Sequence, residues 1–204
     1  METIRKAVIE DVEAIVKIHE QAFPDFFLTT LGAKFLNLYY RCLCKSKNAV
    51  TLCAEENGML VGFAMCSYVS HGFNTLLIKR NLYKFGQMAI YLLFTNPKAV
   101  LRLVKNLDKK SNESIVDDKG EYAELYSIAV LPNHQGMGIG KSLLMAIEKD
   151  VIKHNGTISL TTDYYDNDKT IGFYHSLGYK DFYEFVTYPE RRMWRMIKSL
   201  DLKK

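Results

Sequence analysis

Residues 135–142 read QGMGIGKS, with three glycines within five positions followed by a lysine and a serine. Glycines at this density let backbone N–H groups approach an anion closely, because no side chain stands in the way. A nucleotide phosphate-binding loop reads G-x-x-x-x-G-K-[ST], so a loop ending here would need glycine at position 135. The chain has Gln135 at that position, and Gly136 comes one residue too late. The spacing therefore disfavours an NTPase and leaves another anion to be identified.

The elements on either side of this stretch predict how it is held. Residues 122–130 form a β-rich run that Pro132 ends, because proline lacks the N–H that a strand ladder needs. After the glycines, apolar residues recur every four positions at Ile139, Leu143 and Ile147, which is typical of a helix with one buried face. We therefore expect the glycines to join a strand to a helix N-terminus, where unpaired N–H groups and the helix dipole favour an anion.

The rest of the chain reads as strands and helices without an internal repeat. An Asn57-Gly58 pair between two β-rich runs predicts a hairpin. Between residues 71 and 110 the pattern becomes helical, and Pro97 marks the start of a second helix there. Strands are expected at about 4–8, 49–55, 59–69, 122–130, 157–163, 182–188 and 193–197, and further helices at about 11–22, 31–44, 139–154 and 167–177.

Composition limits the class of protein. The 204 residues are 48% hydrophobic and 25% charged, which fits one globular domain spanning 1–204. The net charge of +4 suits an anionic cofactor and is too small to indicate nucleic-acid binding. Four cysteines lack metal-binding spacing, so we expect reduced thiols, no metal site and a cytoplasmic protein. The most apolar window, 85–95, is far shorter than the ~20 residues that span a bilayer, so we expect no stable membrane insertion.

Two motifs resemble those of a known family. The pattern Val130-x-Pro132-x-x-Gln135-x-x-Gly138-x-Gly140 resembles the acyl-CoA signature of the GNAT superfamily of N-acetyltransferases. The pattern Asn167-x-x-Thr170-Ile171-x-Phe173-Tyr174-x-x-x-Gly178-Tyr179 is similar to a later motif of that superfamily, with Thr170 where alanine is commoner. Together the motifs cover about 122–180. The opening strand, two helices and hairpin are similar in order to the family's N-terminal half, whereas the segment at 71–110 has no counterpart in the minimal fold.

The resemblance implies a fold and a cofactor. The fold is the α/β GNAT acyl-CoA N-acyltransferase fold, a mixed, mostly antiparallel central sheet flanked by helices, here with a helical insertion before the central strand. Acetyl-CoA is the implied acetyl donor, with its pyrophosphate on the glycine-rich stretch and its pantetheine arm between two splayed strands. The implied cofactor-binding residues are Ile128, Ala129, Val130, Gln135, Gly136, Met137, Gly138, Ile139, Gly140, Lys141, Ser142, Asn167, Thr170 and Tyr174.

Acetyl transfer to an amine needs a proton acceptor, because a free alkyl amine has a pKa of about 10 and attacks only in its neutral form. Glu124 occupies the position where histone-type members of the superfamily carry their catalytic base. Strand alternation predicts that its side chain shares one face with Tyr126, Ile128 and Val130. A surface glutamate near a strand start is the alternative role for Glu124, and Asp163 or a water relay is the alternative base.

Proton donation to the departing thiolate of coenzyme A is the second catalytic requirement. Tyr174 matches the family's general acid, in the helix that follows Asn167. A core aromatic is its alternative role, since the chain has 13 tyrosines. Direct attack by the amine requires neither a metal nor a cysteine nucleophile.

These residues predict an acetyl-CoA-dependent N-acetyltransferase that acts on a primary amine by direct attack. A small-molecule acceptor is favoured, because the insertion at 71–110 is placed to close a pocket. Two alternatives stay open: acetylation of a protein or peptide amine, and a non-catalytic module that binds or senses acyl-CoA. A homodimer is compatible with each of them.

Overall fold

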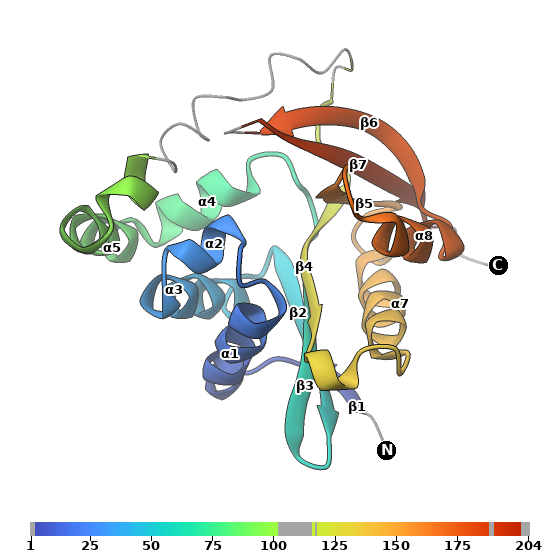
Figure 1. Ribbon diagram of the computed structural model, residues 1–204, viewed down its shortest axis with the longest axis horizontal. Coiled ribbons are helices and arrows are strands. Elements are labelled where there is room, and N and C mark those ends of the chain that lie inside the picture. Colours follow the sequence, from blue (N-terminus) through green and yellow to red (C-terminus); the bar gives the residue numbers. More distant parts are fainter. Residues whose placement is uncertain (1–2, 102–115, 117, 188–189, 201–204) are drawn as a thin grey trace.

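The computed structural model describes residues 3–101, 116, 118–187 and 190–200. Within them, a seven-stranded sheet lies between two groups of helices (Figure 1). The strands are β1 (Thr3–Lys6), β2 (Ala49–Glu56), β3 (Met59–Ser67), β4 (Ala123–Val130), β5 (Thr157–Asp163), β6 (Lys180–Thr187) and β7 (Arg191–Ser199). The helices are α1 (Val12–Ala22), α2 (Phe27–Thr30), α3 (Ala33–Cys44), α4 (Phe73–Arg80), α5 (Leu82–Thr95), α7 (Ile139–Val151) and α8 (Asp168–Ser176), with short 3-10 helices η1 (Ile9–Asp11) and η2 (Pro132–His134).

The sheet has the predicted mixed character. Its strand order is β1-β2-β3-β4-β5-β7-β6, and every neighbouring pair is antiparallel except β4 and β5, which run parallel. The expected fold, a mostly antiparallel sheet flanked by helices, is therefore confirmed. The predicted hairpin is also confirmed, because Asn57 and Gly58 join β2 to β3 with φ values of 51° and 78°. These are the left-handed values that a two-residue hairpin turn requires.

Most predicted elements are present with shifted ends. The helix expected from residue 31 begins at Ala33, because Gly32 has a φ of 86° and so cannot be helical. The short helix α2 before it was not predicted, since four residues carry too little periodicity to be recognised. The last strand is longer than expected and runs from Arg191 to Ser199.

Two hydrophobic cores form on opposite faces of the sheet, because successive side chains of a strand point to opposite faces. On β3, Ala64 faces the core that holds α7, whereas Phe63 faces the core that holds α1 and α3. Gly62 precedes them where the layers approach most closely. A Cβ atom there would lie 2.9 Å from the carbonyl oxygen of Ala129 and 3.2 Å from a methyl carbon of Leu143. The absence of a side chain at Gly62 therefore lets α7 lie close to the central strands.

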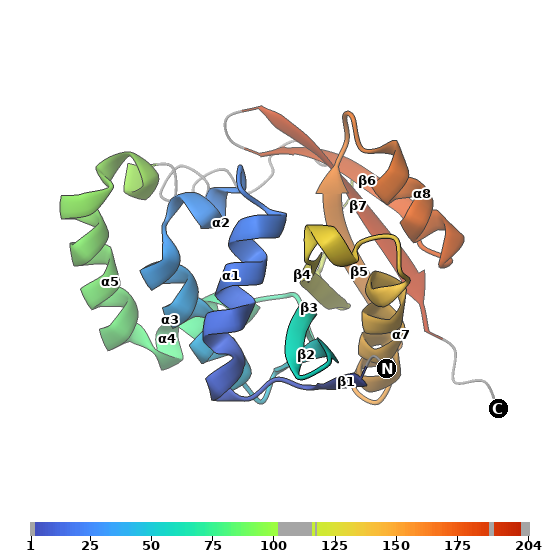
Figure 2. The ribbon, with the colours of Figure 1, turned by 60° about the horizontal axis from the view of Figure 1, so that its bottom comes forward.

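The insertion adds a further helical layer outside α3 (Figure 2). Helix α5 packs beside α3 through Phe85, Met88 and Leu92, in a small core shared with Leu31 and Phe35. The chain is helical again at 97–101, and the remainder of the predicted segment, 102–110, lies outside the described residues. In the part of the chain that the structure describes, no helix has both the length and the apolar character needed to cross a bilayer.

Candidate active site

The parallel strands β4 and β5 separate along their length. They pair only at Ala123 with Ile158, Glu124 with Ser159, and Leu125 with Leu160. From Leu125 to Val130, β4 advances a further ~17 Å at about 3.3 Å per residue, with no register to β5. The β5-facing edge of that segment therefore offers its backbone groups to a ligand, and an extended chain could pair with it as an added strand.

The backbone groups near the end of β4 point either toward β3 or toward the gap. The N–H of Leu131 donates to the carbonyl of Val61 on β3, 2.8 Å away. The carbonyl of Val130 instead accepts a hydrogen bond from the side-chain amide of Gln135, at 3.2 Å. Because backbone groups of alternate residues point to the same edge of a strand, Ile128 faces the gap together with Val130. Gln135 thus fixes the start of the glycine loop against the open end of the gap.

The glycine loop ends at the N-terminus of α7. Gly138 is the residue before the helix and has a φ of 87°, a left-handed value that favours glycine. The first helical hydrogen bond of this region runs from the N–H of Ser142 to the carbonyl of Gly138, at 3.0 Å. The N–H groups of 139–141 precede it and therefore have no partner within the helix. With the helix dipole behind them and no acidic residue in the first turn, they are suited to bind an anion.

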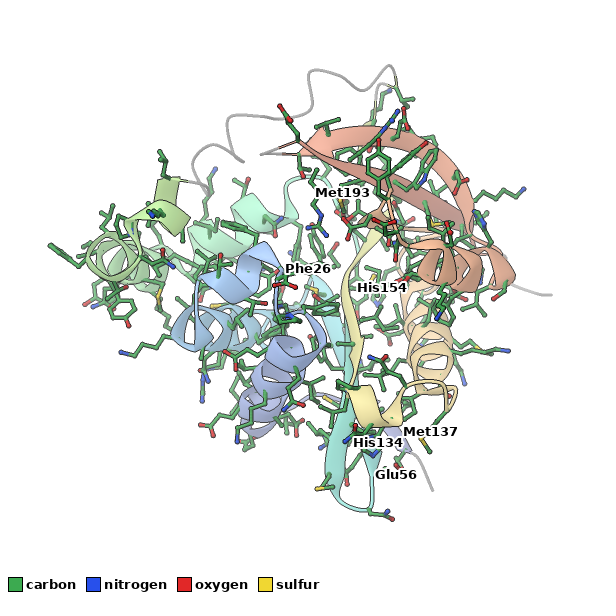
Figure 3. The ribbon with its side chains drawn as sticks, viewed as in Figure 1. Phe26, Glu56, His134, Met137, His154 and Met193 are labelled. Carbon is green, nitrogen blue, oxygen red and sulfur yellow. The ribbon has the colours of Figure 1, made fainter. Side chains whose placement is uncertain are left out.

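The loop is also fixed to the β2–β3 hairpin, which limits how far it can move. His134 lies 3.5 Å from the carboxylate of Glu56, and Figure 3 shows the two side chains together at the foot of β3. Met137, at the tip of the loop, points outward and is 62% exposed. His134 therefore links the glycine loop to the hairpin.

The predicted alternation along β4 is wrong beyond Tyr126. The register with β3 passes from Leu125 directly to Ser127, so Tyr126 is an extra residue and β4 contains a β-bulge. Tyr126 packs in the core of α1 and α3, whereas Ile128 and Val130 pack in the core of α7. Side chains expected on one face are therefore divided between two. The residues of β4 all suit a regular strand and give no sign of an inserted residue, so the sequence could not reveal it.

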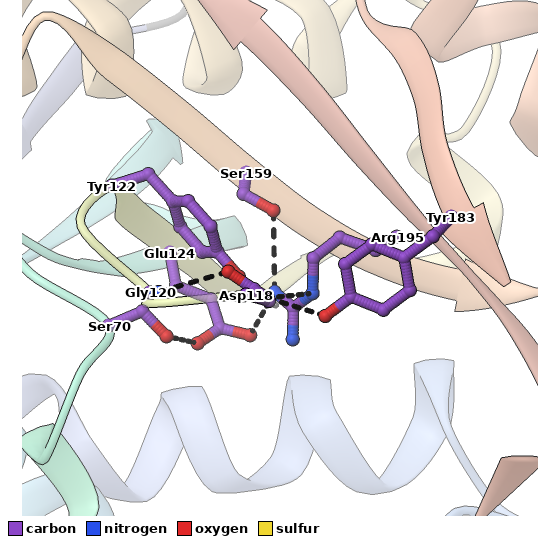
Figure 4. A network of polar contacts seen from close by, with 8 residues as sticks. All are labelled: Ser70, Asp118, Gly120, Tyr122, Glu124, Ser159, Tyr183 and Arg195. Atoms are coloured by element: carbon purple, nitrogen blue, oxygen red, sulfur yellow. Dashed lines mark hydrogen bonds and ion pairs between the residues drawn. The ribbon is translucent and has the colours of Figure 1, made fainter. Parts of the chain in front are cut away.

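Glu124 lies at the closed end of the gap, where the last pairs between β4 and β5 form. Its side chain is nearly buried and both carboxylate oxygens are engaged (Figure 4). One accepts a hydrogen bond from the hydroxyl of Ser70, and the other lies 2.9 Å from a guanidinium nitrogen of Arg195. A carboxylate can accept about four hydrogen bonds, so these contacts leave room for a proton from a substrate or water. The assignment of Glu124 as base stays a prediction.

Arg195, on β7, is the cation that this carboxylate faces. Burial disfavours its charge, but Glu124, Tyr122 and Tyr183 together outweigh that effect, and the pKa of Arg195 is raised. Asp118 lies 3.6 Å away on another side, and the rings of Tyr122 and Tyr183 lie 5.3 and 5.9 Å from the guanidinium carbon. The arginine is therefore held by two carboxylates and aromatic faces, and it fixes Glu124 in one position.

Asp163, the alternative base, and Asn167, the residue expected to bind the cofactor, lie at the other end of β5. Both carboxylate oxygens of Asp163 accept hydrogen bonds from Arg191 in a bidentate ion pair. The side-chain NH2 of Asn167 donates to the hydroxyl of Thr162 at 2.6 Å and to the carbonyl of Asp163 at 3.0 Å. Its carbonyl oxygen is the group left to accept a hydrogen bond from a ligand. Thr170 follows in the first turn of α8, half-buried.

Tyr174 is buried in the core of α7, on the opposite side of the sheet from Glu124. Its ring contacts those of Phe173 and Tyr179, with centroids 5.3 and 5.6 Å apart. Burial raises the pKa of Tyr174, so the phenol is protonated at neutral pH, as a proton donor must be. The structure therefore places the two predicted catalytic residues on opposite faces of the sheet, without a contact between them. The general-acid role of Tyr174 stays a prediction.

Sequence reasoning missed the residues around Glu124. Ser70, Tyr183 and Arg195 are far from Glu124 in the chain, with Ser70 54 positions before it and Arg195 71 positions after it. Asp118 is near in the chain but precedes β4. No local motif signals these residues. Only an expected pairing of β7 beside β5, which places Arg195 opposite Thr161, could have indicated the ion pair.

Comparison with known proteins gives a consistent result. Residues 12–179 match the model of the acetyltransferase (GNAT) family. The ribosomal-protein-S18-alanine N-acetyltransferase of Escherichia coli is similar in structure, with a TM-score of 0.62, 17% identity, and coverage of 100% of this chain and 97% of that one. An N-acetyltransferase from Staphylococcus aureus Mu50 has a TM-score of 0.61, 15% identity, and coverage of 98% and 99%. An N-acetyltransferase from Thermoplasma acidophilum, solved in complex with coenzyme A, has a TM-score of 0.53, 16% identity, and coverage of 98% and 99%. At these identities the likeness concerns the fold, and no curated protein matches the chain.

Proposed function

The chain belongs to the acetyltransferase (GNAT) family, and on that basis we propose that it transfers the acetyl group of acetyl-CoA to a primary amine of a small molecule by direct attack. One observation carries this proposal. The strands β4 and β5 pair at only three positions, and the gap beyond them has an anion site at its open end and Glu124 at its closed end. A long, thin donor with phosphates at one end and a thioester at the other fits this arrangement.

The residues of the chain fit acetyl-CoA in three places. The unpaired N–H groups of 139–141 suit its pyrophosphate, with the hydroxyl of Ser142 as a further donor. The gap-facing backbone of Ile128 and Val130 suits the amides of the pantetheine arm, as an added strand would. The carbonyl of Asn167 suits an N–H of the same arm. Acetyl-CoA supplies an activated acyl group with a thiolate as leaving group.

Two proton transfers remain for the protein. As the bond between the amine nitrogen and the acyl carbon forms and the bond from that carbon to sulfur breaks, the amine loses one proton and the thiolate gains one. Glu124 accepts the first, directly or through water, and Tyr174 donates the second. Arg195 and Ser70 hold the carboxylate of Glu124 in place.

The surroundings of Glu124 support a small-molecule acceptor. Ser70 and Phe73, at the start of the insertion, reach Glu124 and Tyr126: the Ser70 hydroxyl binds the carboxylate, and the rings of Phe73 and Tyr126 are 5.5 Å apart. Aromatic and acidic side chains at one position suit a small organic amine. A protein or peptide amine is the second candidate, because one similar structure is named for acetylation of a ribosomal-protein alanine.

A thermal shift assay followed by an activity screen tests the proposal. Acetyl-CoA and coenzyme A should raise the melting temperature and ATP should not, since a ligand at about 100 times its Kd stabilises the folded state by about 2.7 kcal/mol. A panel of small amines and short peptides is then assayed for release of the coenzyme A thiol. Stabilisation by ATP alone would overturn the proposal. Stabilisation by coenzyme A without thiol release from any amine would indicate the non-catalytic module instead.

A further inference from the structure

Helix α5 has apolar side chains on two opposite sides. Phe85, Met88 and Leu92 face α3, at spacings of three and four residues. The opposite side presents Tyr83, Ile90, Leu93 and Phe94, which we call the outer face of α5. Phe94 is 86% exposed, Tyr83 77% and Ile90 59%. The helix carries one charge, Lys84, and residues 85–95 carry none.

An uncharged helix surface of this kind is normally covered. A helix that is apolar on all sides is usually buried, and large contiguous apolar patches mark sites of protein or membrane contact. In both ribbon views α5 is the outermost layer of the molecule, beyond α3 (Figures 1 and 2). The outer face of α5 therefore has the character of a docking surface.

The charges around this surface indicate what docks there. Between Phe26 and Leu101 the chain has eight basic and two acidic residues, and the acidic ones are Glu55 and Glu56, on the hairpin side of β2. A hollow of about 670 Å³ lies between α3 and α5, and its lining includes Lys34, Arg41, Lys45 and Lys84 and no acidic residue among those the structure describes. This excess contrasts with a net charge of only +4 for the whole chain. The partner is therefore anionic.

The arrangement distinguishes among anionic partners. Nucleic acid is bound by cations placed at the centre of the contact, where the phosphates lie. Here the centre of the surface is aromatic and aliphatic, and the cations lie around the hollow between α3 and α5. That is the arrangement of an amphipathic helix at a lipid surface, where apolar side chains enter the acyl boundary and lysines reach the headgroups. A second copy of the chain would bring two basic regions together, which is unfavourable.

We propose that the outer face of α5 docks on the surface of a bilayer that contains anionic lipids, with Lys34, Arg41, Lys45 and Lys84 against the headgroups. The docking is peripheral and reversible. Helices α5 and α7 lie at opposite sides of the molecule (Figure 1), so the glycine loop before α7 faces water when α5 lies on the membrane. A water-soluble cofactor then reaches its site without leaving the aqueous phase.

Vesicle sedimentation with the full chain tests this proposal. The protein should sediment with vesicles that contain phosphatidylglycerol, should not sediment with phosphatidylcholine alone, and should be released by salt. Each basic side chain near an anionic surface contributes about fivefold in affinity. The variant with Lys34, Arg41, Lys45 and Lys84 all changed to Gln should therefore bind about 600-fold more weakly if the four contributions are additive.

A second pair of variants separates the apolar contact from charge alone. Ile90→Ser with Phe94→Ser should abolish sedimentation, whereas Met145→Ser should not, because Met145 is similarly exposed but lies on α7. A tryptophan introduced at position 94 should be quenched by brominated lipid, and one at position 145 should not. All substituted side chains are on the surface, so the melting temperature and its rise with coenzyme A should match those of the parent.

Several results would overturn the proposal. Equal sedimentation with neutral and anionic vesicles, or sedimentation unchanged by either set of variants, would exclude docking through this surface. A dimer in sedimentation equilibrium that Phe94→Ser converts to a monomer would assign the outer face of α5 to a second copy of the chain. Salt-sensitive binding to a DNA or RNA oligonucleotide, with none to vesicles, would assign the basic region to nucleic acid.

Discussion

The guanidinium of Arg195 lies 2.9 Å from the carboxylate of Glu124, although the two residues are on different strands and 71 positions apart. The ion pair is almost buried, with side-chain exposures of 13% and 11%. Removing one partner of such a pair leaves the other charge uncompensated. Substitutions at Glu124 should therefore keep a hydrogen-bond acceptor for Arg195, so that loss of the base is not confused with loss of the fold.

Glu124→Gln should lower kcat/KM by about 10²–10⁴-fold at neutral pH, because an amide cannot take the proton of the amine. The acid limb of the pH profile should flatten, and the Kd for acetyl-CoA should stay the same, since the amide oxygen still accepts from Arg195. Ser70→Ala is the matched control, because it removes the other contact of the carboxylate and leaves the base. An acid limb that persists in Glu124→Gln would transfer the role to a water relay or to Asp163.

Gly140→Glu should weaken acetyl-CoA binding by at least an order of magnitude, measured by calorimetry, because it introduces a carboxylate beside the unpaired N–H groups of α7. Gly140→Ala is the control. A Cβ atom at this position lies 3.9 Å from Phe173 and 4.0 Å from Val130, which is ordinary contact, so the methyl group should be accepted with affinity unchanged. If Gly140→Glu is folded and binds as the parent does, the phosphates lie elsewhere.

Tyr174→Phe should reduce kcat by about 10²–10⁴-fold and leave the Kd for coenzyme A nearly unchanged, because it removes a proton donor and keeps the ring contacts. The neighbouring Tyr179→Phe serves as a comparison, since that phenol is also buried. A kcat equal to that of the parent, with the chemical step shown to limit turnover, would return Tyr174 to a packing role.

His19 should make the protein less stable as the pH falls from about 6.5 toward 4. Its ring is buried with one nitrogen 2.7 Å from the hydroxyl of Tyr40, and burial lowers its pKa to about 4. Below the unfolded pKa of about 6.5 only the unfolded chain takes up the proton, so this group should remove about 2 kcal/mol of stability by about pH 5. Urea unfolding of the parent at pH 7 and at pH 5 measures this loss of stability.

His19→Asn is the control for this pH dependence, because its amide can still bond to Tyr40 but does not titrate between those pH values. The variant should be less stable at neutral pH, since the smaller side chain leaves space in the core of α1. Its stability should nevertheless change less between pH 7 and pH 5. An equal loss in parent and variant would mean that other groups cause the acid sensitivity.

Local features of the molecule could be predicted from the sequence. The hairpin at Asn57-Gly58, the strand at 157–163 and the loop-to-helix junction at Gly138 depend on residues within a few positions of one another. Turn chemistry, period-two patterns and helix starts are all read at that range. The glycine loop therefore lies, as expected, between β4 and α7, and Asn167 lies at the start of α8.

Features that depend on the pairing of distant strands could not be predicted. The bulge at Tyr126 arises from the register of β4 against β3, and no apolar pattern records a register. Arg195 reaches Glu124 only because β7 enters the sheet beside β5, out of chain order. The exposure of Phe94 could not be predicted either, because an apolar residue in a helix is expected to face a core.

The bulge at Tyr126 also bears on how the specificity of this enzyme could be changed by engineering. It places Tyr126 on one side of the sheet and Ile128 and Val130 on the other, within one short strand. Substitutions at residues that face opposite sides of a sheet and share no contacts tend to have additive effects. Libraries that vary Tyr126 and its neighbour Phe73 should therefore yield variants with altered acceptor preference. Their affinity for the acetyl donor should equal that of the parent.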